Sequence, residues 1–217
     1  MVLIVIDIDR YYLSKLSKAV RDQLVALASH CMDAIRSTHP IVRVLYDSTM
    51  THSRLLTIRE KADVISGKDD RGLGSLKHIE SDWLFVKNKV SAAQPALLAA
   101  LPAPSQTVLV IMGTNTGECI ANSLKDFVLK GYRCVVVTDG LGDYHHIAPD
   151  PQWHEDTLRQ TMHTWIPDLT AKIVYMTSKN FLQYDSDTLN GLFRGDKEKP
   201  ALPFDNAGFK TLPSLKS

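Results

Sequence analysis

The chain has 217 residues, of which 44% are hydrophobic and 23% are charged, so it is long enough for one domain with a sizeable core. Its formal net charge of +1 provides no overall field for nucleic acid or an anionic membrane, and we expect neither as a partner. Three cysteines without a CxxC pair argue against a disulfide framework and a zinc cluster, and they favour a reducing, cytoplasmic location.

Strands and helices are expected to alternate along most of the chain. Residues 2–6 form a wholly apolar run that is typical of a strand buried on both faces, and residues 13–36 carry apolar side chains at helical spacing. Further strands are expected at 41–46, 83–86, 107–112, 134–138 and 171–176, and further helices at 94–101, 119–130 and 156–165. This alternation predicts an α/β fold with a single doubly wound, mostly parallel six-stranded sheet and helices on both faces.

Two segments do not follow this alternation. Residues 51–81 are polar and irregular, which indicates a long excursion over one face of the sheet. From residue 185 onward the chain loses periodicity and is rich in glycine, proline and charge, which is typical of an extended or disordered tail. We therefore expect one domain over residues 1–184 and a tail over residues 185–217.

Polar side chains follow several of the expected strands. Asp7 follows the first strand, Lys87 the third and Cys119 the fourth, and open parallel sheets bind ligands at this edge. An ammonium group and a helix N-terminus both favour the thiolate form of a cysteine, and an adjacent carboxylate can accept the thiol proton. Each residue alone has an ordinary structural explanation, but the three together predict a nucleophilic site.

The segments around these residues resemble the isochorismatase-like cysteine hydrolases, which include nicotinamidases and carbamoyl-type amidohydrolases. Residues 111–120 (IMGTNTGECI) resemble the cysteine loop of that family. Residues 5–12 (VIDIDRYY) resemble its aspartate segment, and residues 86–92 (VKNKVSA) resemble its lysine segment. The three motifs stand in the order of the family, and the resemblance covers roughly residues 2–182.

The resemblance implies a catalytic triad and a reaction. Cys119 would be the nucleophile, Asp7 the general base and then acid, and Lys87 would hold Asp7 charged and help to lower the thiol pKa. The family has a non-proline cis peptide bond that falls here at Thr114–Asn115, and the amides of Asn115 and Cys119 would form an oxyanion hole. The implied reaction is hydrolysis of a small amide-type substrate (a carboxamide, ureide or related compound) through a thioester, without a cofactor.

The chain also departs from the family pattern. Tyr12 stands at a phenylalanine position, where it would wall the substrate pocket, and Ala93 replaces another phenylalanine. Gly117 replaces a common histidine, and Asp9 replaces a glutamine. The charge of Asp9 lies close to Asp7 along the chain, so we expect the pKa of one of the two carboxyl groups to be raised.

A metal site is not expected. Nicotinamidases carry an Asp-x-His metal motif, whereas here Asp47 is followed by serine and threonine, and His52 is the nearest histidine. By the same resemblance we expect a homodimer or a homotetramer.

Three other interpretations stay open. Asp7 and Asp9 after a strand, with the acidic segment 139–143, also resemble a haloacid-dehalogenase-like phosphatase, although Tyr11 stands where that family has threonine or valine. Residues 114–117 resemble a flavodoxin phosphate loop, which normally follows the first strand rather than the fourth. The third interpretation is a catalytically weak or inactive relative that acts as an interaction protein.

Overall fold

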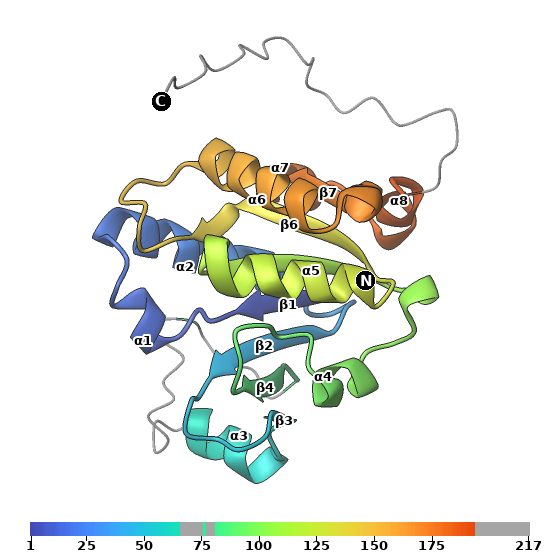
Figure 1. Ribbon diagram of the computed structural model, residues 1–217. Coiled ribbons are helices and arrows are strands. Elements are labelled where there is room, and N and C mark those ends of the chain that lie inside the picture. The colour runs from blue at the N-terminus through green and yellow to red at the C-terminus, as the bar shows by residue number, and fades with distance from the viewer. Residues whose placement is uncertain (66–75, 77–80, 194–217) are drawn as a thin grey trace.

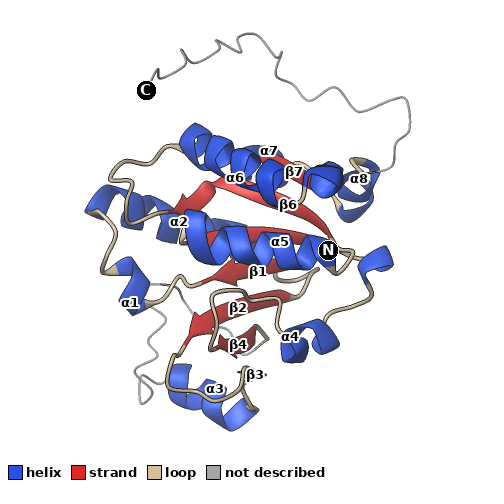
Figure 2. Cartoon of the chain, in the orientation of Figure 1, coloured by secondary structure: helices blue, strands red, loops and turns tan. Residues whose placement is uncertain are grey.

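The computed structural model describes residues 1–65, 76 and 81–193. These residues form a seven-stranded sheet in the order β3-β4-β2-β1-β5-β6-β7, which Figures 1 and 2 show between two layers of helices. The strands are β1 (Val2–Ile6), β2 (Ile41–Tyr46), β3 (Arg54–Leu55), β4 (Trp83–Lys87), β5 (Val108–Thr114), β6 (Arg133–Gly142) and β7 (Ile173–Met176). Neighbouring strands are parallel except for the antiparallel pair β3–β4. The predicted doubly wound, mostly parallel fold is confirmed.

Helices cover both faces of the sheet. They are α1 (Arg10–Leu13), α2 (Lys18–Ile35), α3 (Ile58–Ile65), α4 (Pro95–Ala100), α5 (Ala121–Leu129), α6 (Pro151–Trp165), α7 (Ser178–Phe181) and α8 (Ser186–Gly191). Successive strand side chains point to opposite faces, so Ile4 and Ile6 of β1 pack with α4, α5 and α6, while Leu3 and Val5 pack with α2, α7 and α8. In Figure 1, α5 lies in front of the sheet and α2 behind it.

The expected strand count is too low by one, because β3 was not predicted. This strand has two residues, too few to give an alternating pattern, and it pairs with Phe85 and Val86 of β4. Helix α3 also lies in the segment expected to be irregular, and its Val64 packs in a small cluster with Leu84 and Val86. Residues 66–75 and 77–80 of that segment lie outside the described residues.

Two helices differ from their expected bounds. The helix expected at 13–36 is divided into α1 and α2, and Ser17 caps α2 by accepting a hydrogen bond from the Val20 amide. Helix α6 begins at Pro151, five residues earlier than expected, because Asp150 caps it and proline suits the first helical position. Because of this earlier start, His154 belongs to α6 and lies on its buried side.

The segment expected to be an extended tail begins with a helix. Residues 186–191 form α8, because Asp185 caps this helix and Leu189 is fully buried against the α2 face of the sheet. The remainder of the expected tail, residues 194–217, lies outside the described residues. No helix in the described part of the chain is long and apolar enough to cross a membrane.

Candidate active site

Three predicted catalytic side chains meet at the edge where the parallel strands end. Asp7 directly follows β1, Lys87 is the last residue of β4, and Cys119 lies in the turn after β5. The Lys87 Nζ atom is 2.7 Å from Asp7 Oδ2, and both side chains are completely buried. Cys119 is 2% exposed, and its thiol lies close enough to both groups for their charges to shift its pKa. The structure therefore brings a thiol, a carboxylate and an ammonium group together.

The backbone around Asp7 holds its side chain in this position. Asp7 has a φ of 52°, a left-handed conformation that is uncommon for residues other than glycine. Its amide donates to the Val44 carbonyl at 2.9 Å, and its carbonyl accepts from the Thr114 hydroxyl at 2.8 Å. On β5, Gly113 lies so close to β1 that a Cβ atom there would be 2.0 Å from the Ile6 carbonyl oxygen. Both neighbours of β1 thus fix the turn that carries the carboxylate.

Lys87 is held by a backbone carbonyl and lies beside two tyrosines. Its Nζ atom donates to the Val90 carbonyl at 2.6 Å and lies 5.6 Å from the centre of the Tyr46 ring. The Tyr46 and Tyr12 rings meet edge-on at 6.3 Å. Burial and then the charges of Asp7 and Cys119 raise the pKa of Tyr12, and its place in the wall of a substrate pocket stays a prediction. No role was predicted for Tyr46, although it stands at the carboxyl end of an expected strand.

The surroundings of Cys119 raise its pKa, opposite to the expected lowering. Burial is the largest effect and the Asp7 carboxylate the next; together they raise the pKa of Cys119 to about 11 despite the opposing effect of Lys87. Burial likewise raises the pKa of Asp7 against the attraction of Lys87. For Lys87, burial opposes the charge, but Asp7 and Cys119 hold its pKa above the ordinary value. The thiol is therefore protonated at neutral pH and needs a base.

A second carboxyl group lies beside the first. Asp9 is 5% exposed, and its Oδ1 accepts a hydrogen bond from the Tyr12 amide at 3.0 Å. Burial raises the pKa of Asp9 to about 6; the Tyr12 amide opposes this shift, and the charge of Asp7 adds to it. The charge of Asp7 therefore raises the pKa of Asp9 as expected, but burial raises it more.

Cys119 lies in a turn with unusual backbone geometry. The Thr114–Asn115 peptide bond is cis, where the resemblance placed it, and residues Thr116–Ile120 form a single π-helical turn. The Thr114 hydroxyl already donates its hydrogen bond to the Asp7 carbonyl. The Asn115 side chain is buried, and neither of its polar atoms makes a hydrogen bond with a described residue. Of these two predicted substrate-binding side chains, Asn115 retains unused hydrogen-bonding groups.

Two residues outside the predicted triad support this turn. The Thr116 hydroxyl lies 2.8 Å from His154 Nδ1, and the Gly117 amide donates to Asp143 Oδ2 at 3.2 Å. His154 is 2% exposed, and burial lowers its pKa to about 4, so its ring is neutral at pH 7. An earlier helix start at Pro151 would have placed His154 four residues before Leu158 on the buried face of α6.

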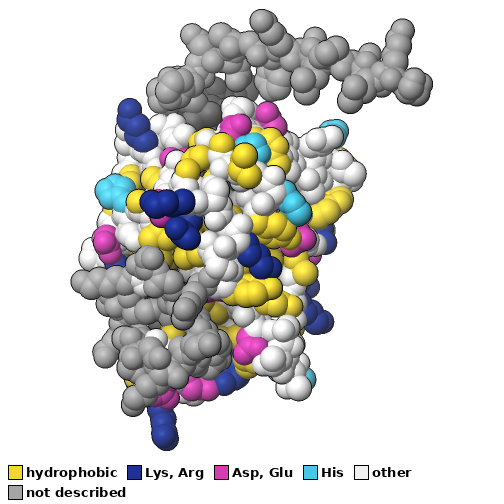
Figure 3. Space-filling model, turned by 90° about the vertical axis from the view of Figure 1, so that its left-hand side faces the viewer, with side chains coloured by type: hydrophobic (Ala, Val, Ile, Leu, Met, Phe, Trp, Pro, Cys, Tyr) yellow, Lys and Arg dark blue, Asp and Glu magenta, His cyan; other side chains and the backbone are white. Residues whose placement is uncertain are grey.

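The two residues considered for a metal, Asp47 and His52, differ in their surroundings. Asp47 Oδ1 accepts hydrogen bonds from the Thr49 amide at 2.9 Å and from the Thr49 hydroxyl at 2.6 Å, while His52 is exposed. Among the described residues, no group of three or more His, Cys, Asp and Glu side chains is placed to hold a metal ion. Figure 3 looks onto the side where the strands end, and its described surface mixes hydrophobic, acidic, basic and histidine side chains.

Comparisons with known proteins give one family and one fold. The sequence matches the model of the isochorismatase domain over residues 1–171, whereas no curated protein matches it. Similar solved structures include an isochorismatase from Pseudomonas putida KT2440, which is 20% identical with a TM-score of 0.55 over 82% of this chain and 88% of that chain. An N-carbamoylsarcosine amidase from Thermoplasma acidophilum is 19% identical with a TM-score of 0.56 over 82% and 95%. A candidate MAR1 ribonuclease from Leishmania major is 13% identical with a TM-score of 0.56 over 94% of each chain.

Proposed function

The chain belongs to the isochorismatase domain family, and on this basis we propose that it hydrolyses the C–N bond of a small amide-type substrate through a Cys119 thioester. The observation that carries the proposal is the buried ion pair between Asp7 and Lys87 beside the thiol. A thiol with a pKa of about 11 is a poor nucleophile at neutral pH unless a base takes its proton as it attacks. Asp7 is the carboxylate in position to do so.

In the proposed first half-reaction, Cys119 Sγ attacks the carbonyl carbon of the substrate while its proton moves to an Asp7 carboxylate oxygen. The tetrahedral intermediate then collapses, its C–N bond breaks, and Asp7 returns the proton to the leaving nitrogen. Ammonia or an amine departs and the acyl group stays on sulfur. Lys87 keeps Asp7 ionised at the start and stabilises the negative charge that passes between oxygen and sulfur.

The negative charge that develops on the substrate oxygen needs hydrogen-bond donors close to that oxygen. We propose that the backbone amides of Asn115 and Cys119, on either side of the turn after β5, supply them. The turn is held by contacts on both sides, from Thr116 to His154 and from Gly117 to Asp143. Donors that are fixed before the reaction need no rearrangement as the charge develops.

In the second half-reaction, water attacks the thioester carbonyl and gives a proton to Asp7. The C–S bond breaks, a carboxylic acid leaves, and the proton on Asp7 returns to the thiolate. Asp7 therefore acts as base and acid in each half, as a carboxyl group with a raised pKa can do. Tyr12 and Tyr46 lie beside the pair and would border the substrate.

The rival interpretations receive less support. Asp139 accepts hydrogen bonds from the Ser178 amide and hydroxyl, both at 2.7 Å. The acidic segment 139–143, which resembles a phosphatase motif, therefore has a structural explanation at its first residue. The family match also argues against the phosphatase and flavodoxin interpretations. Ribonuclease activity is not carried over from the Leishmania protein, because a net charge of +1 offers little general attraction for RNA.

Ammonia release from a panel of small carboxamides, ureides and carbamoyl compounds tests the proposal, with wild type and Cys119→Ala assayed side by side. We expect at least one substrate to be turned over by wild type and not by Cys119→Ala. Trapping with hydroxylamine should yield the hydroxamate of the same acyl group. Equal activity of the two proteins contradicts the thioester mechanism. An inert wild type whose Cys119 is also unreactive toward small acylating agents favours the interaction-protein alternative.

A further inference from the structure

The loop that follows Lys87 is tied to the helix that follows Cys119. Residues 88–94 connect β4 to α4, and in this loop the Ala92 amide donates to the Ser123 hydroxyl at 2.8 Å. Ser123 is the third residue of α5 and lies four residues after Cys119. Both Ala92 and Ser123 are completely buried. One buried hydrogen bond therefore joins the segments that carry two of the three predicted catalytic side chains.

The same loop holds the Lys87 ammonium group. Its Nζ atom donates to the Val90 carbonyl at 2.6 Å and lies 2.7 Å from Asp7 Oδ2. Val90 stands two residues before Ala92, so the position of the Val90 carbonyl depends on where the Ala92 amide is held. A displacement of the loop would move the ammonium group relative to the carboxylate and the thiol.

The Ala92 amide needs a partner because it is buried. The Ser123 oxygen supplies that partner, and Ser123→Ala would remove it, so the loop would have to shift to bring the amide to another acceptor. The Ala92 side chain also packs in the core between the sheet and α5, but apolar packing is not directional. The hydrogen bond therefore determines the place of the loop on α5 more closely than packing does.

We propose that Ser123 is a positioning residue for the lysine of the site. By holding the Ala92 amide it fixes the Val90 carbonyl, and through that carbonyl it sets where the Lys87 ammonium group lies relative to Asp7 and Cys119. Its effect on turnover rests on the proposed hydrolase function. Its effect on the thiol does not, because the reactivity of the thiol is measured without a substrate.

The thiol is best tested in an Asp7→Asn background. Burial and the Asp7 carboxylate raise the pKa of Cys119, whereas Lys87 lowers it, so in this background Lys87 is the charged partner that remains. Adding Ser123→Ala should move the midpoint of iodoacetamide labelling at Cys119 to higher pH by roughly half a unit or more. Adding Ser123→Thr instead, which keeps the hydroxyl, should leave the midpoint where it is in Asp7→Asn.

Turnover gives a second readout in a chain that retains Asp7. Ser123→Ala should lower kcat roughly 10- to 100-fold and change KM little, because a displaced charge raises the barrier without removing a contact with the bound substrate. Ser123→Thr should retain most of kcat. If wild type hydrolyses no substrate, the hydrolase proposal fails, and the labelling experiment still decides the role of Ser123.

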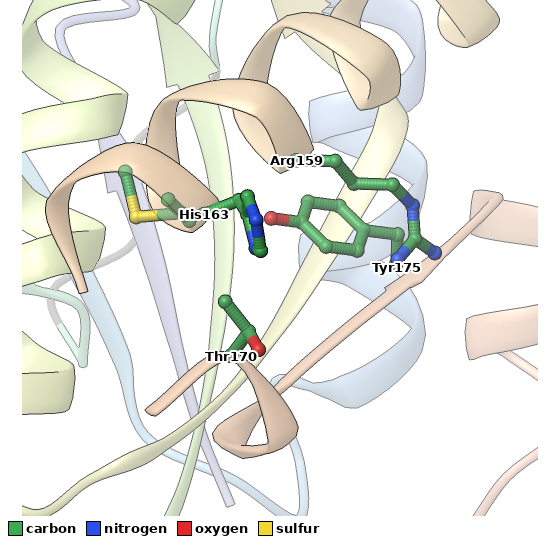
Figure 4. Close-up of a pocket in the computed structure, with 5 residues that line it drawn as sticks. Arg159, His163, Thr170 and Tyr175 are labelled. Carbon is green, nitrogen blue, oxygen red and sulfur yellow. The ribbon is translucent and has the colours of Figure 1, made fainter. Parts of the chain in front are cut away.

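Two hydroxyl groups outside the site provide controls. The Ser178 hydroxyl donates to Asp139 at 2.7 Å, so Ser178→Ala is the same substitution with the loss of one hydrogen bond. Tyr175→Phe removes a buried hydroxyl from a cavity of about 280 Å³, shown in Figure 4, that shares no lining residue with the candidate active site. The cavity is lined by Arg159, Met162, His163, Thr170 and Tyr175. Neither control should change kcat or the labelling midpoint of Cys119.

A third substitution shows whether Ser123 acts through the lysine. In a protein that carries both Asp7→Asn and Lys87→Met, adding Ser123→Ala should cause no further shift of the labelling midpoint. A shift of equal size with and without Lys87 overturns the proposal, because Ser123 would then act on the thiol through α5. An unchanged midpoint in the presence of Lys87 also overturns it, whatever the loss of stability. Should Asp7→Asn not fold, a kcat that Ser123→Ala leaves unchanged, or that Ser123→Thr does not restore, overturns it.

Discussion

The ammonium group of Lys87 lies 2.7 Å from the carboxylate of Asp7, and neither side chain is exposed. The same carboxylate raises the pKa of the neighbouring Cys119 thiol. Lys87 therefore favours the ionised forms of both Asp7 and Cys119, but burial opposes it at both residues and the pKa of each stays raised. Removal of Asp7 and removal of Lys87 should therefore shift the pKa of Cys119 in opposite directions.

Replacing Asp7 with asparagine should abolish turnover and yet lower the pKa of Cys119. Loss of the general base should reduce kcat by roughly 10³-fold. The thiol, in contrast, loses its repulsion from a negative charge and becomes the anionic partner of Lys87. The rate of iodoacetamide labelling at Cys119, followed by mass spectrometry across pH, should therefore rise at lower pH in Asp7→Asn than in wild type.

The control for that measurement is Cys119→Ser, which identifies the labelled residue. Cys31 and Cys134 are buried, and burial raises the pKa of both, so they should label slowly in each protein. An unchanged or higher pKa of Cys119 in Asp7→Asn would mean that the carboxylate does not control the thiol.

The Asp7–Lys87 pair should show strong coupling in a double-mutant cycle. Lys87→Met leaves a buried carboxylate without its partner, and Asp7→Asn leaves a buried ammonium group, so each should cost roughly 3–5 kcal/mol of unfolding free energy. The double variant leaves no isolated charge and should cost clearly less than the sum. Urea unfolding at pH 7.5 measures all four corners. Additive losses would show that the pair is not coupled in solution.

Asp9 should make the protein less stable as the pH rises through 6. Its pKa is about 6 in the fold and about 4 in an unfolded chain, so the protonated form favours folding. That contribution is complete below pH 4 and is lost as pH rises past 6. Asp9→Asn does not titrate, and at pH 8 it should be more stable than wild type by up to about 3 kcal/mol relative to their difference at pH 4.

Asp185→Asn is the matched control for this effect. Asp185 also caps a helix by accepting from a backbone amide, but it lies on the surface and its hydrogen bonds with Thr188 lower its pKa. As the pH rises, this variant should become less stable relative to wild type, whereas Asp9→Asn should become more stable relative to wild type. The same sign in both variants would mean that capping, rather than burial, determines the response of Asp9.

The architecture of the sheet could be predicted because its central strands are simple. β1 is an apolar run that stops at Asp7, β2 is apolar except for Arg43 and stops at Asp47, and both have the expected bounds. The strand order brings Asp7 and Cys119 together, since β1 and β5 are neighbours, and Lys87 is long enough to reach across the end of β2. β3 and α3 could not be predicted, because their positions depend on packing against β4.

The electrostatics of the site could not be predicted from residue types. The sequence places an ammonium group near a thiol, and a lowered pKa is the ordinary consequence. The raised pKa of Cys119 follows from burial and from the position of Asp7, and both are properties of the folded chain. The support given to the turn that carries Cys119 by α6 was missed because that helix was expected to begin only at residue 156, which left His154 outside it.

His154 should make the protein sensitive to acid. Its pKa is about 4 in the fold and about 6.5 when unfolded, so the neutral ring favours folding. That contribution is fully present above pH 6.5 and is lost as pH falls toward 4, a change of up to about 3 kcal/mol. His154→Gln keeps a hydrogen-bonding group near Thr116 without titrating, so the stability difference between wild type and variant should shrink by that amount between pH 7.5 and pH 4.

The activity of His154→Gln at pH 7.5 adds a second readout. If the contact with Thr116 only stabilises the fold, kcat is unchanged in the folded variant. If it positions the turn that carries Cys119, kcat falls while KM changes little, because the turn would donate to the transition state rather than to the bound amide. We expect the fall in kcat, since the Thr116 hydroxyl lies in the same helical turn as the nucleophile.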